Sequence, residues 1–261
     1  MTVTLLGFPW DASSSHARGP ALAPPTIRAL LYSDASSPYS LSGVDFRKAI
    51  TSQDFTDLPE NAEACRAAIS ARIAEAVQSR AKPLSLGGDH SVTFPILRAM
   101  KAAHGPVNIL HIDAHPDLYD EFDGDPYSHA CPFARALEEG CVGNLVQIGI
   151  RSAGPNQRAF GKKHGVTMLG ADALDKLPYK KLDGLLYVSI DLDGIDPAFA
   201  PGVSHPEPGG LSTREVLSVL SKLPASPVGA DIVELNPEKD INLATAHVAA
   251  RLVKELAAMM L

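Results

Sequence analysis

The sequence predicts an α/β fold in which helices cover both faces of a central, mostly parallel sheet. Three observations support this prediction: short apolar runs rich in β-branched residues recur along the chain, helical stretches separate most of them, and polar clusters directly follow several of them. Near-continuous apolar strands are typical of parallel sheets that are buried between helices. We therefore expect a three-layer sandwich with helices in the two outer layers.

The expected strands are the apolar, β-branched runs themselves. In chain order they are 2–8, 82–88, 107–113, 144–150, 165–169, 185–191 and 228–234. The expected helices lie between most of them, at 61–80, 91–104, 213–223 and 244–260. There is no internal repeat or low-complexity linker, and the Pro/Gly-rich stretch 197–210 resembles an ordered loop after a strand. We therefore expect residues 1–261 to form a single α/β domain.

The composition is ordinary for a soluble globular protein, with 45% hydrophobic and 20% charged residues. The net charge is −7 without a block of lysine or arginine, so we expect no nucleic-acid partner. The N-terminus lacks the basic region of a signal peptide, and no apolar run approaches the roughly 18 residues that span a membrane. Cys65, Cys131 and Cys141 are an odd number without a CxxC pair, which argues against a disulfide framework and a thiolate zinc site. We therefore expect a cytoplasmic protein with no membrane partner.

Polar clusters follow the apolar runs at four places. GGDH follows PLSL, DAHPD follows ILHI, DLDGIDP follows YVSI, and an acidic residue closes the run in GADIVELNP. In open α/β sheets, ligands bind outside the carboxyl ends of the strands. We therefore expect the four clusters to converge on one region.

The clusters contain a set of residues typical of metal ligands. Alternation along an extended chain places Asp113, His115 and Asp117 on one side, and it does the same for Asp191 and Asp193. With the histidine that closes the GGDH turn, the candidate ligands are His90, Asp113, His115, Asp117, Asp191 and Asp193. Carboxylates and imidazoles without thiolate suit Mn²⁺ better than structural zinc. The set is large for one catalytic ion but suits two ions about 3.5–4 Å apart that share bridging carboxylates.

Each part of this set also has an ordinary structural explanation. One Asp-x-His pair can be a capped turn, and Asp191 and Asp193 can form a turn or a helix N-cap ahead of Pro197. The combination with His90 favours a metal site, because ionised carboxylates out of water are costly unless they are paired or bound to a metal.

Four motifs resemble those of the ureohydrolases, the family of arginases and agmatinases. GGDHS at 87–91, DAHPD at 113–117 and SIDLDGIDPAFAPG at 189–202 are similar to its three metal signatures, and GADIVELNPEKD at 229–240 is similar to its acidic substrate motif. The resemblance extends from RGPALAPPTIR to the C-terminal helix. The segments 118–135, 147–152 and 201–212 look closest to the agmatinase-like branch, which includes the plant-type arginases. The resemblance implies an arginase/deacetylase-like sandwich with a sheet of about eight strands.

The resemblance also implies a role for each matching residue. His90, Asp113, Asp117 and Asp191 would hold one or the other manganese ion, His115 and Asp193 would complete the pair, and Asp117 and Asp191 would be the bridges. His129, in SHACPF, matches the histidine that the family uses for proton transfer or substrate contact. Glu234 matches the glutamate that pairs with the guanidinium group. Ala130 stands where many members carry glycine, so the local loop shape is expected to differ.

The expected reaction is hydrolysis of a linear guanidino compound to urea and an amine. A centre of two Mn²⁺ ions per chain would supply hydroxide at neutral pH. Glu234 would hold the guanidinium group, and His129 or Asp117 would give a proton to the leaving amine. Nickel, cobalt and iron are alternative ions for the same ligands.

Agmatine is the favoured substrate, because Tyr119 stands where animal and common bacterial arginases carry an asparagine that helps to bind the α-amino-acid end. L-Arginine is the alternative, since the plant-type branch resembles this sequence in the same segment, and another guanidino or formimino compound is the third. A single-zinc deacetylase of the same broad fold would not need His90, Asp117 and Asp193. A non-catalytic metal-binding protein would not need Glu234. The resemblance also implies a homo-oligomer, a trimer or a hexamer.

Other residues have subsidiary expected roles. His111 is expected to be a buried, hydrogen-bonded histidine farther from the metals, and Asp89 and Asp231 are kept out of the primary site as supporting or core carboxylates. His205 is a candidate for the mouth of the site. A nucleophilic Cys131 paired with a nearby histidine is disfavoured, because it leaves the metal-type residues unexplained.

Overall fold

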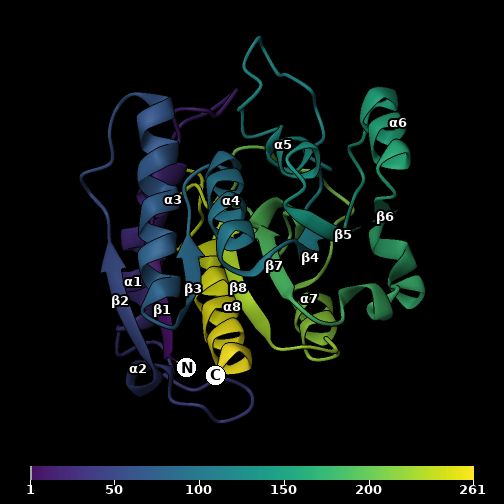
Figure 1. Cartoon of the computed structure of the whole chain (residues 1–261). Coiled ribbons are helices and arrows are strands. Elements are labelled where there is room, and N and C mark those ends of the chain that lie inside the picture. The colour runs from purple at the N-terminus through teal and green to yellow at the C-terminus, as the bar shows by residue number, and fades with distance from the viewer. Residues whose placement is uncertain (1) are drawn as a thin grey trace.

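The computed structural model describes residues 2–261 and contains an eight-stranded sheet (Figure 1). Its strands are β1 (Thr2–Gly7), β2 (Ile50–Asp54), β3 (Ala81–Leu86), β4 (Val107–Ile112), β5 (Val142–Ile148), β6 (Thr167–Leu169), β7 (Leu186–Asp191) and β8 (Pro227–Val233). They lie in the order β2-β1-β3-β8-β7-β4-β5-β6, and every neighbouring pair is parallel. The predicted α/β class with a central parallel sheet is confirmed.

Helices cover both faces of this sheet. They are α1 (Ala23–Leu31), α2 (Phe46–Ala49), α3 (Ala62–Gln78), α4 (Thr93–His104), α5 (Pro132–Glu138), α6 (Pro155–Lys163), α7 (Thr213–Leu220) and α8 (Ala244–Met260). On one face, α1, α7 and α8 share a core with Leu110 and Ile112 of β4. On the other, α3, α4 and α5 share a core with Val107 and Ile109 of the same strand. Because alternate residues of a strand point to opposite faces, burial on both sides makes the strands continuously apolar.

Some elements have a weak signal in the sequence. β2 lies at the edge of the sheet with mostly exposed side chains, so the segment ITSQD contains no apolar run. The helices α1, α5 and α6 are short, although each carries proline in its first two positions, which is a recognised start signal. The predicted helix 213–223 ends at Leu220, and the predicted strand 228–234 ends one residue before Glu234.

The four polar clusters lie on four neighbouring strands in the middle of the sheet. β3, β8, β7 and β4 are adjacent in that order. His90, Glu234, Asp191 and Asp113 lie at or just after the carboxyl ends of these strands. The expected convergence of the strand ends is confirmed, and it results from the sheet order, which brings together residues more than a hundred positions apart in the chain.

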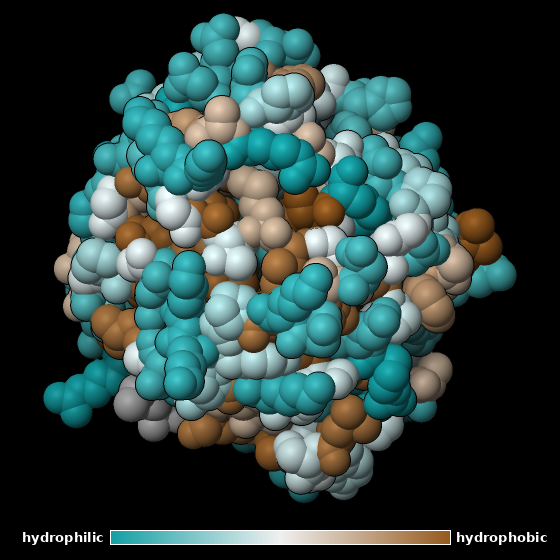
Figure 2. Space-filling view, turned by 90° about the vertical axis from the view of Figure 1, so that its right-hand side faces the viewer, coloured by the Kyte–Doolittle hydropathy of each residue, from teal (hydrophilic) through white to brown (hydrophobic). Residues whose placement is uncertain are grey.

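Figure 2 shows the side of the molecule on which β6 and α6 lie. Hydrophobic residues appear there as separate patches between hydrophilic ones. Within residues 2–261, no helix combines the length and the apolar character that crossing a membrane requires.

Candidate functional site

A tight turn after β3 places His90 at the centre of the site. The fully buried Asp89 caps a 3₁₀ turn at His90–Val92, and its backbone N–H donates to the Trp10 carbonyl at 2.8 Å. A Cβ atom on Gly88 would lie only 1.8 Å from that carbonyl oxygen. Glycine is therefore required here because another backbone segment approaches it closely.

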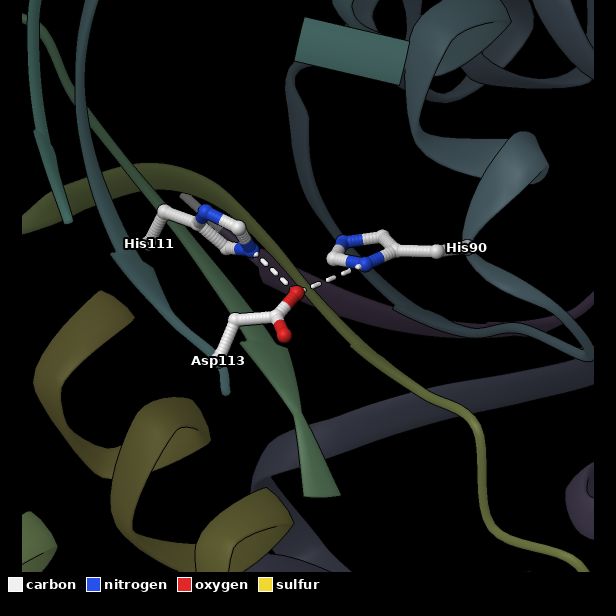
Figure 3. A group of neighbouring side chains, drawn as sticks. All are labelled: His90, His111 and Asp113. Carbon is white, nitrogen blue, oxygen red and sulfur yellow. Dashed lines mark hydrogen bonds and ion pairs between the residues drawn. The ribbon is translucent and has the colours of Figure 1, made fainter. Parts of the chain in front are cut away.

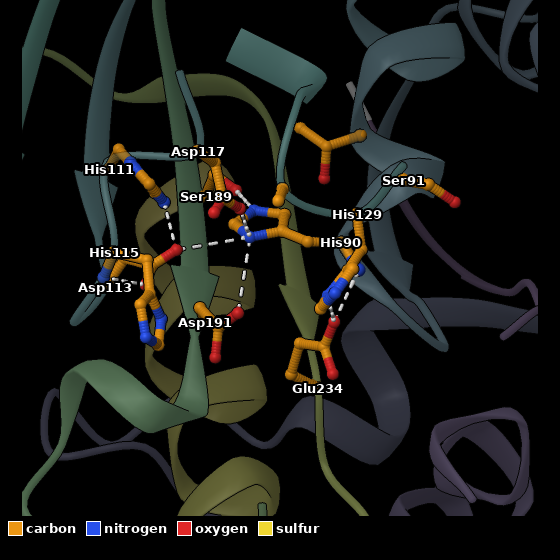
Figure 4. A network of polar contacts seen from close by, with 12 residues as sticks. His90, Ser91, His111, Asp113, His115, Asp117, His129, Ser189, Asp191 and Glu234 are labelled. Carbon is orange, nitrogen blue, oxygen red and sulfur yellow. Dashed lines mark hydrogen bonds and ion pairs between the residues drawn. The ribbon is translucent and has the colours of Figure 1, made fainter. Parts of the chain in front are cut away.

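The six predicted ligands come together in two groups, and Figure 4 labels all of them except Asp193. In the first, His90 Nδ1 lies 3.0 Å from Asp117 Oδ2 and 3.3 Å from the Oδ2 atoms of both Asp113 and Asp191. In the second, His115 Nδ1 lies 3.0 Å from Asp193 Oδ2 and 3.5 Å from Asp113 Oδ1. Asp113 is the carboxylate that contacts both histidines, one with each oxygen.

The two groups have the spacing and the charge of divalent-cation sites. Ligands about 2.1 Å from one octahedral ion lie about 3 Å from each other, which matches the separations around His90. His90 Nδ1 is completely buried without a hydrogen-bond partner, as expected of a lone pair that serves a cation. The four aspartates Asp113, Asp117, Asp191 and Asp193 are at most 7% exposed. Four buried carboxylates this close to one another need a compensating cation, so these residues fit a metal centre.

The titration behaviour of two aspartates reflects this excess of negative charge. Burial and the neighbouring carboxylates of Asp193 and Asp113 hold the pKa of Asp191 well above its usual value. Burial, together with the charge of Asp113, raises the pKa of Asp193 to about 7. Both shifts reflect burial and the repulsion between neighbouring carboxylates.

His111 supports Asp113 from inside the core, as Figure 3 shows. Its Nε2 atom lies 2.7 Å from Asp113 Oδ2, and its Nδ1 atom lies 2.9 Å from the amide nitrogen of Gln147. Although His111 lies within ligand distance of His90 and Asp113, both of its ring nitrogens are already occupied. It is the buried, hydrogen-bonded histidine that the sequence predicts, and it orients a ligand.

A second chain of hydrogen bonds supports His90. Its Nε2 atom lies 3.0 Å from Ser189 Oγ, and Ser189 donates to Asp231 Oδ1 at 2.6 Å. The other oxygen of Asp231 accepts from Tyr187 at 2.7 Å and from Thr93 at 2.9 Å. Ser189 was not predicted, although its position two residues before Asp191 on β7 places it on the same face of that strand.

Glu234 and His129 form a pair beside the metal-ligand groups. Glu234 Oε1 accepts from the His90 backbone N–H at 2.9 Å and lies 3.0 Å from His129 Nδ1, while Oε2 is buried without a partner. Burial alone lowers the pKa of His129, but the hydrogen bond and charge of Glu234 outweigh it and raise the pKa to about 9. Glu234 has a left-handed backbone with φ of 65°, as Asp117 does with φ of 51°. Such strained conformations cluster at functional sites.

A cavity of about 150 Å³ opens onto these groups. Its lining includes the ligands Asp117, Asp191 and Asp193 and the pair His129 and Glu234. Further lining residues are Ser15, Tyr119, Ser152, Gln157 and His205. His205, the candidate for the mouth of the site, lines this cavity and is partly buried. Ser15 Oγ lies 2.9 Å from His129 Nε2. The loop that carries Ser15 is held in place by a hydrogen bond from the Ser13 N–H to Asp89 Oδ2 at 2.9 Å.

Two polar residues near the motifs lie outside the site. Asp120 is largely exposed and pairs with Arg135 at 2.7 Å. Cys131 is fully buried, and burial raises the pKa of its thiol to about 12, so it would be a poor nucleophile at neutral pH.

Comparison with known proteins gives consistent matches along the whole chain. The model of the Arginase family matches residues 1–259. Arginase 1, mitochondrial, of Arabidopsis thaliana is 43% identical over 98% of this chain and 80% of that protein. Agmatinase, mitochondrial, of Gallus gallus is 33% identical over 98% of this chain and 80% of that protein. The solved arginase from Medicago truncatula has a TM-score of 0.93 and 41% identity, covering 99% of this chain and 87% of that one.

The names of these relatives contradict one expectation from the sequence. The arginases of Arabidopsis thaliana, Oryza sativa and Medicago truncatula are each named mitochondrial. The expectation of a cytoplasmic location, which rested on the absence of a secretory signal peptide, is therefore wrong. A secretory signal is one of several kinds of targeting segment, so its absence does not select the cytoplasm.

Proposed function

Because the chain belongs to the arginase family, whose members are hydrolases acting on guanidino C–N bonds, we propose that it hydrolyses L-arginine to urea and L-ornithine. The observation that carries this choice is the 43% identity to a plant arginase, against 33% to an agmatinase. The comparisons favour L-arginine as the substrate. The residue Tyr119 had favoured agmatine, because it stands where many arginases carry an asparagine. Agmatine is the second candidate, because the agmatinase also matches over 98% of this chain.

The proposed cofactor is a pair of divalent ions. His90, Asp117 and Asp191 would hold one ion and His115 and Asp193 the other, with Asp113 shared, because its two oxygens face the two histidines. This assignment differs from the predicted bridges, Asp117 and Asp191, since Asp117 contacts only the first group. Mn²⁺ is the proposed ion, because the donors are carboxylates and imidazoles without thiolate. When bound, such ions lower the pKa of water and so supply hydroxide at neutral pH.

Glu234 is the proposed binding residue for the guanidinium group. Its Oε1 atom is fixed by two hydrogen-bond donors, whereas the buried Oε2 atom has none. A guanidinium N–H would satisfy Oε2 with a charge-assisted hydrogen bond. Because the His90 N–H also holds Glu234, the guanidinium carbon is positioned relative to the metal ligands, and orientation is a large part of the barrier.

His129 is the proposed proton donor to the departing amine. Its Nδ1 atom faces Glu234, and its raised pKa keeps the ring protonated at neutral pH. Ser15 lies at the other ring nitrogen and at the solvent side of the cavity, so it can hold the ring in place while the proton is replaced. We assign this role to His129 rather than to Asp117, because the contacts of Asp117 are with His90.

Two further expectations remain part of the proposal. We infer that residues 1–261 fold as one unit, because a single sheet contains strands from both ends of the chain. We also infer that the chain forms a trimer or a hexamer, which light scattering coupled to size-exclusion chromatography would distinguish from a monomer.

The test is urea release by Mn²⁺-loaded protein with L-arginine and agmatine in parallel. We expect a higher kcat/KM for L-arginine. We also expect Glu234→Gln to lower kcat/KM by about ten- to a hundred-fold, because a hydrogen bond to a charged group contributes about 1.5–3 kcal/mol. The exposed Glu121→Gln is the control. Turnover of agmatine alone would overturn the assignment of L-arginine as the substrate. If neither compound released urea, the proposed reaction would be overturned.

A further inference from the structure

A third cluster of metal-ligating side chains lines the cavity. One ring nitrogen each of His129 and His205 and a carboxylate oxygen of Glu234 lie within 4.8 Å of one another. The two imidazole rings are 5.2 Å apart between centroids and inclined by 34°. None of these residues belongs to the two ligand groups around His90 and His115. The cluster is therefore separate from the proposed pair of ions.

The donor set is one that binds zinc. Two imidazoles and one carboxylate form a known three-ligand arrangement that leaves an open position for water. His129 Nδ1 and Glu234 Oε1 are 3.0 Å apart, close to the separation of about 3.3 Å between two ligands of a tetrahedral ion. The buried Glu234 Oε2 atom, which has no hydrogen-bond partner, offers a further oxygen.

The surroundings of the cluster also fit a cation. Ser15 Oγ lies 2.9 Å from His129 Nε2, so the ring nitrogen that faces away from Glu234 already has the hydrogen-bond partner typical of a metal-bound histidine. His205 is only partly buried and lines the cavity, which gives an ion access from solvent. The exposed His16 ring lies 5.7 Å from that of His205 and adds a further imidazole nearby.

The ion pair between His129 and Glu234 can be explained without a metal, because each group balances the charge of the other. That explanation does not require His205, whose ring lies beside His129 without a hydrogen bond to either residue among those in the described chain. His205 is thus the residue that distinguishes a metal site from a simple ion pair.

We infer that His129, His205 and Glu234 bind one divalent cation such as Zn²⁺ in addition to the two proposed ions. This cation prevents the guanidinium group of the substrate from binding to Glu234. The exclusion rests on the proposed function, in which Glu234 holds the guanidinium. A cation on the same carboxylate removes the acceptor that the substrate needs. Zinc at this site is therefore a competitive inhibitor with respect to L-arginine.

The experiment counts both metals in the same sample. Protein loaded with Mn²⁺ is dialysed against a series of Zn²⁺ concentrations, and manganese and zinc per chain are measured by elemental analysis. We expect about two equivalents of manganese to remain while about one of zinc is added. We expect His205→Ala to weaken zinc binding by more than about ten-fold, whereas the exposed His104→Ala leaves it unchanged.

Three outcomes would overturn the inference. Replacement of manganese by zinc with a constant total would mean that zinc enters only the ligand groups around His90 and His115. Undiminished zinc binding by His205→Ala, or by His205→Gln if the alanine variant does not fold, would remove His205 from the site. Zinc inhibition that L-arginine cannot relieve would contradict the exclusion. If no urea is released at all, the proposed function fails, while the metal count still decides whether the site exists.

Discussion

Ser189 donates a 2.6 Å hydrogen bond to Asp231 directly beneath the candidate metal ligands. Ser189 Oγ also lies 3.0 Å from His90 Nε2, so a completely buried carboxylate acts on a candidate metal ligand through one hydroxyl group. Two more hydroxyl groups, of Tyr187 and Thr93, fix the other oxygen of Asp231. The orientation of the His90 ring is therefore set by Asp231, which acts on the ring through Ser189.

Asp231→Asn is expected to weaken Mn²⁺ binding by about ten- to a hundred-fold, the usual effect of losing a partner behind a metal ligand. The amide has nearly the shape of the carboxylate but cannot accept a hydrogen bond at both terminal atoms. Isothermal titration of the metal-free protein measures the affinity. Asp120→Asn, at an exposed position, is the control. Wild-type affinity in Asp231→Asn would show that the network does not orient His90.

Mn²⁺ is expected to raise the thermal stability of the protein, because it compensates the buried carboxylates. An ion at about 100 times its Kd stabilises the folded state by about 2.7 kcal/mol, and a chelator should reverse this. Calorimetric melting with and without Mn²⁺ measures the shift. Asp193→Asn should reduce the shift, whereas Asp120→Asn should preserve it. An equal shift in both variants would mean that Asp193 is not a ligand.

His129→Asn is expected to lower kcat by about 10²- to 10⁴-fold, the usual contribution of a general acid or base. Its manganese content should stay that of the wild type, because His129 lies outside the two ligand groups. Steady-state urea release and elemental analysis measure the two quantities. Added imidazole should restore part of kcat by supplying the missing proton donor. An unchanged kcat would move proton delivery to another group, with Asp117 as the next candidate.

Gly88→Ala is expected to destabilise the protein by about 1–3 kcal/mol, because the new methyl group would overlap the Trp10 carbonyl and force the backbone apart. Denaturant unfolding measures the free-energy change. Trp10 is the single tryptophan of the chain, so its fluorescence in the folded state reports whether the first loop has moved. Wild-type stability with an unchanged emission spectrum would contradict the close approach.

Much of the fold was predictable because its strands are buried on both faces. Runs such as VNILHID stand out from the polar segments around them, because Val107 and Ile109 pack into the core on one face of the sheet and Leu110 and Ile112 into the core on the other. β2 was not predictable, because an edge strand with exposed side chains lacks this signal. The short helix α5 was not predicted, because it begins within the segment 118–135 that resembles the agmatinase-like branch. The helix α6 was not predicted because it has little apolar signal: its buried residues are Gln157 and Gly161.

The predicted ligands were recognisable from their residue types and spacing, but the contacts between these ligands and their supporting partners were not. Asp113 and His115 stand together in the sequence, and DAHPD already indicates a metal site. Ser189 and Asp231 are 42 residues apart and chemically ordinary, so only the pairing of β7 with β8 makes them neighbours. Ser15 is likewise separated from His129 by 114 residues.

The sequence by itself therefore determined the parallel α/β architecture, the acidic and imidazole character of the strand ends and the resemblance to ureohydrolases. These properties depend on local composition and periodicity, which any segment carries with it. The tertiary structure decided that Asp113 lies between the two histidines, that His205 joins His129 and Glu234, and that Asp231 supports His90. Such relationships depend on strand order and loop packing, because contacts between distant segments form only when the sheet is assembled.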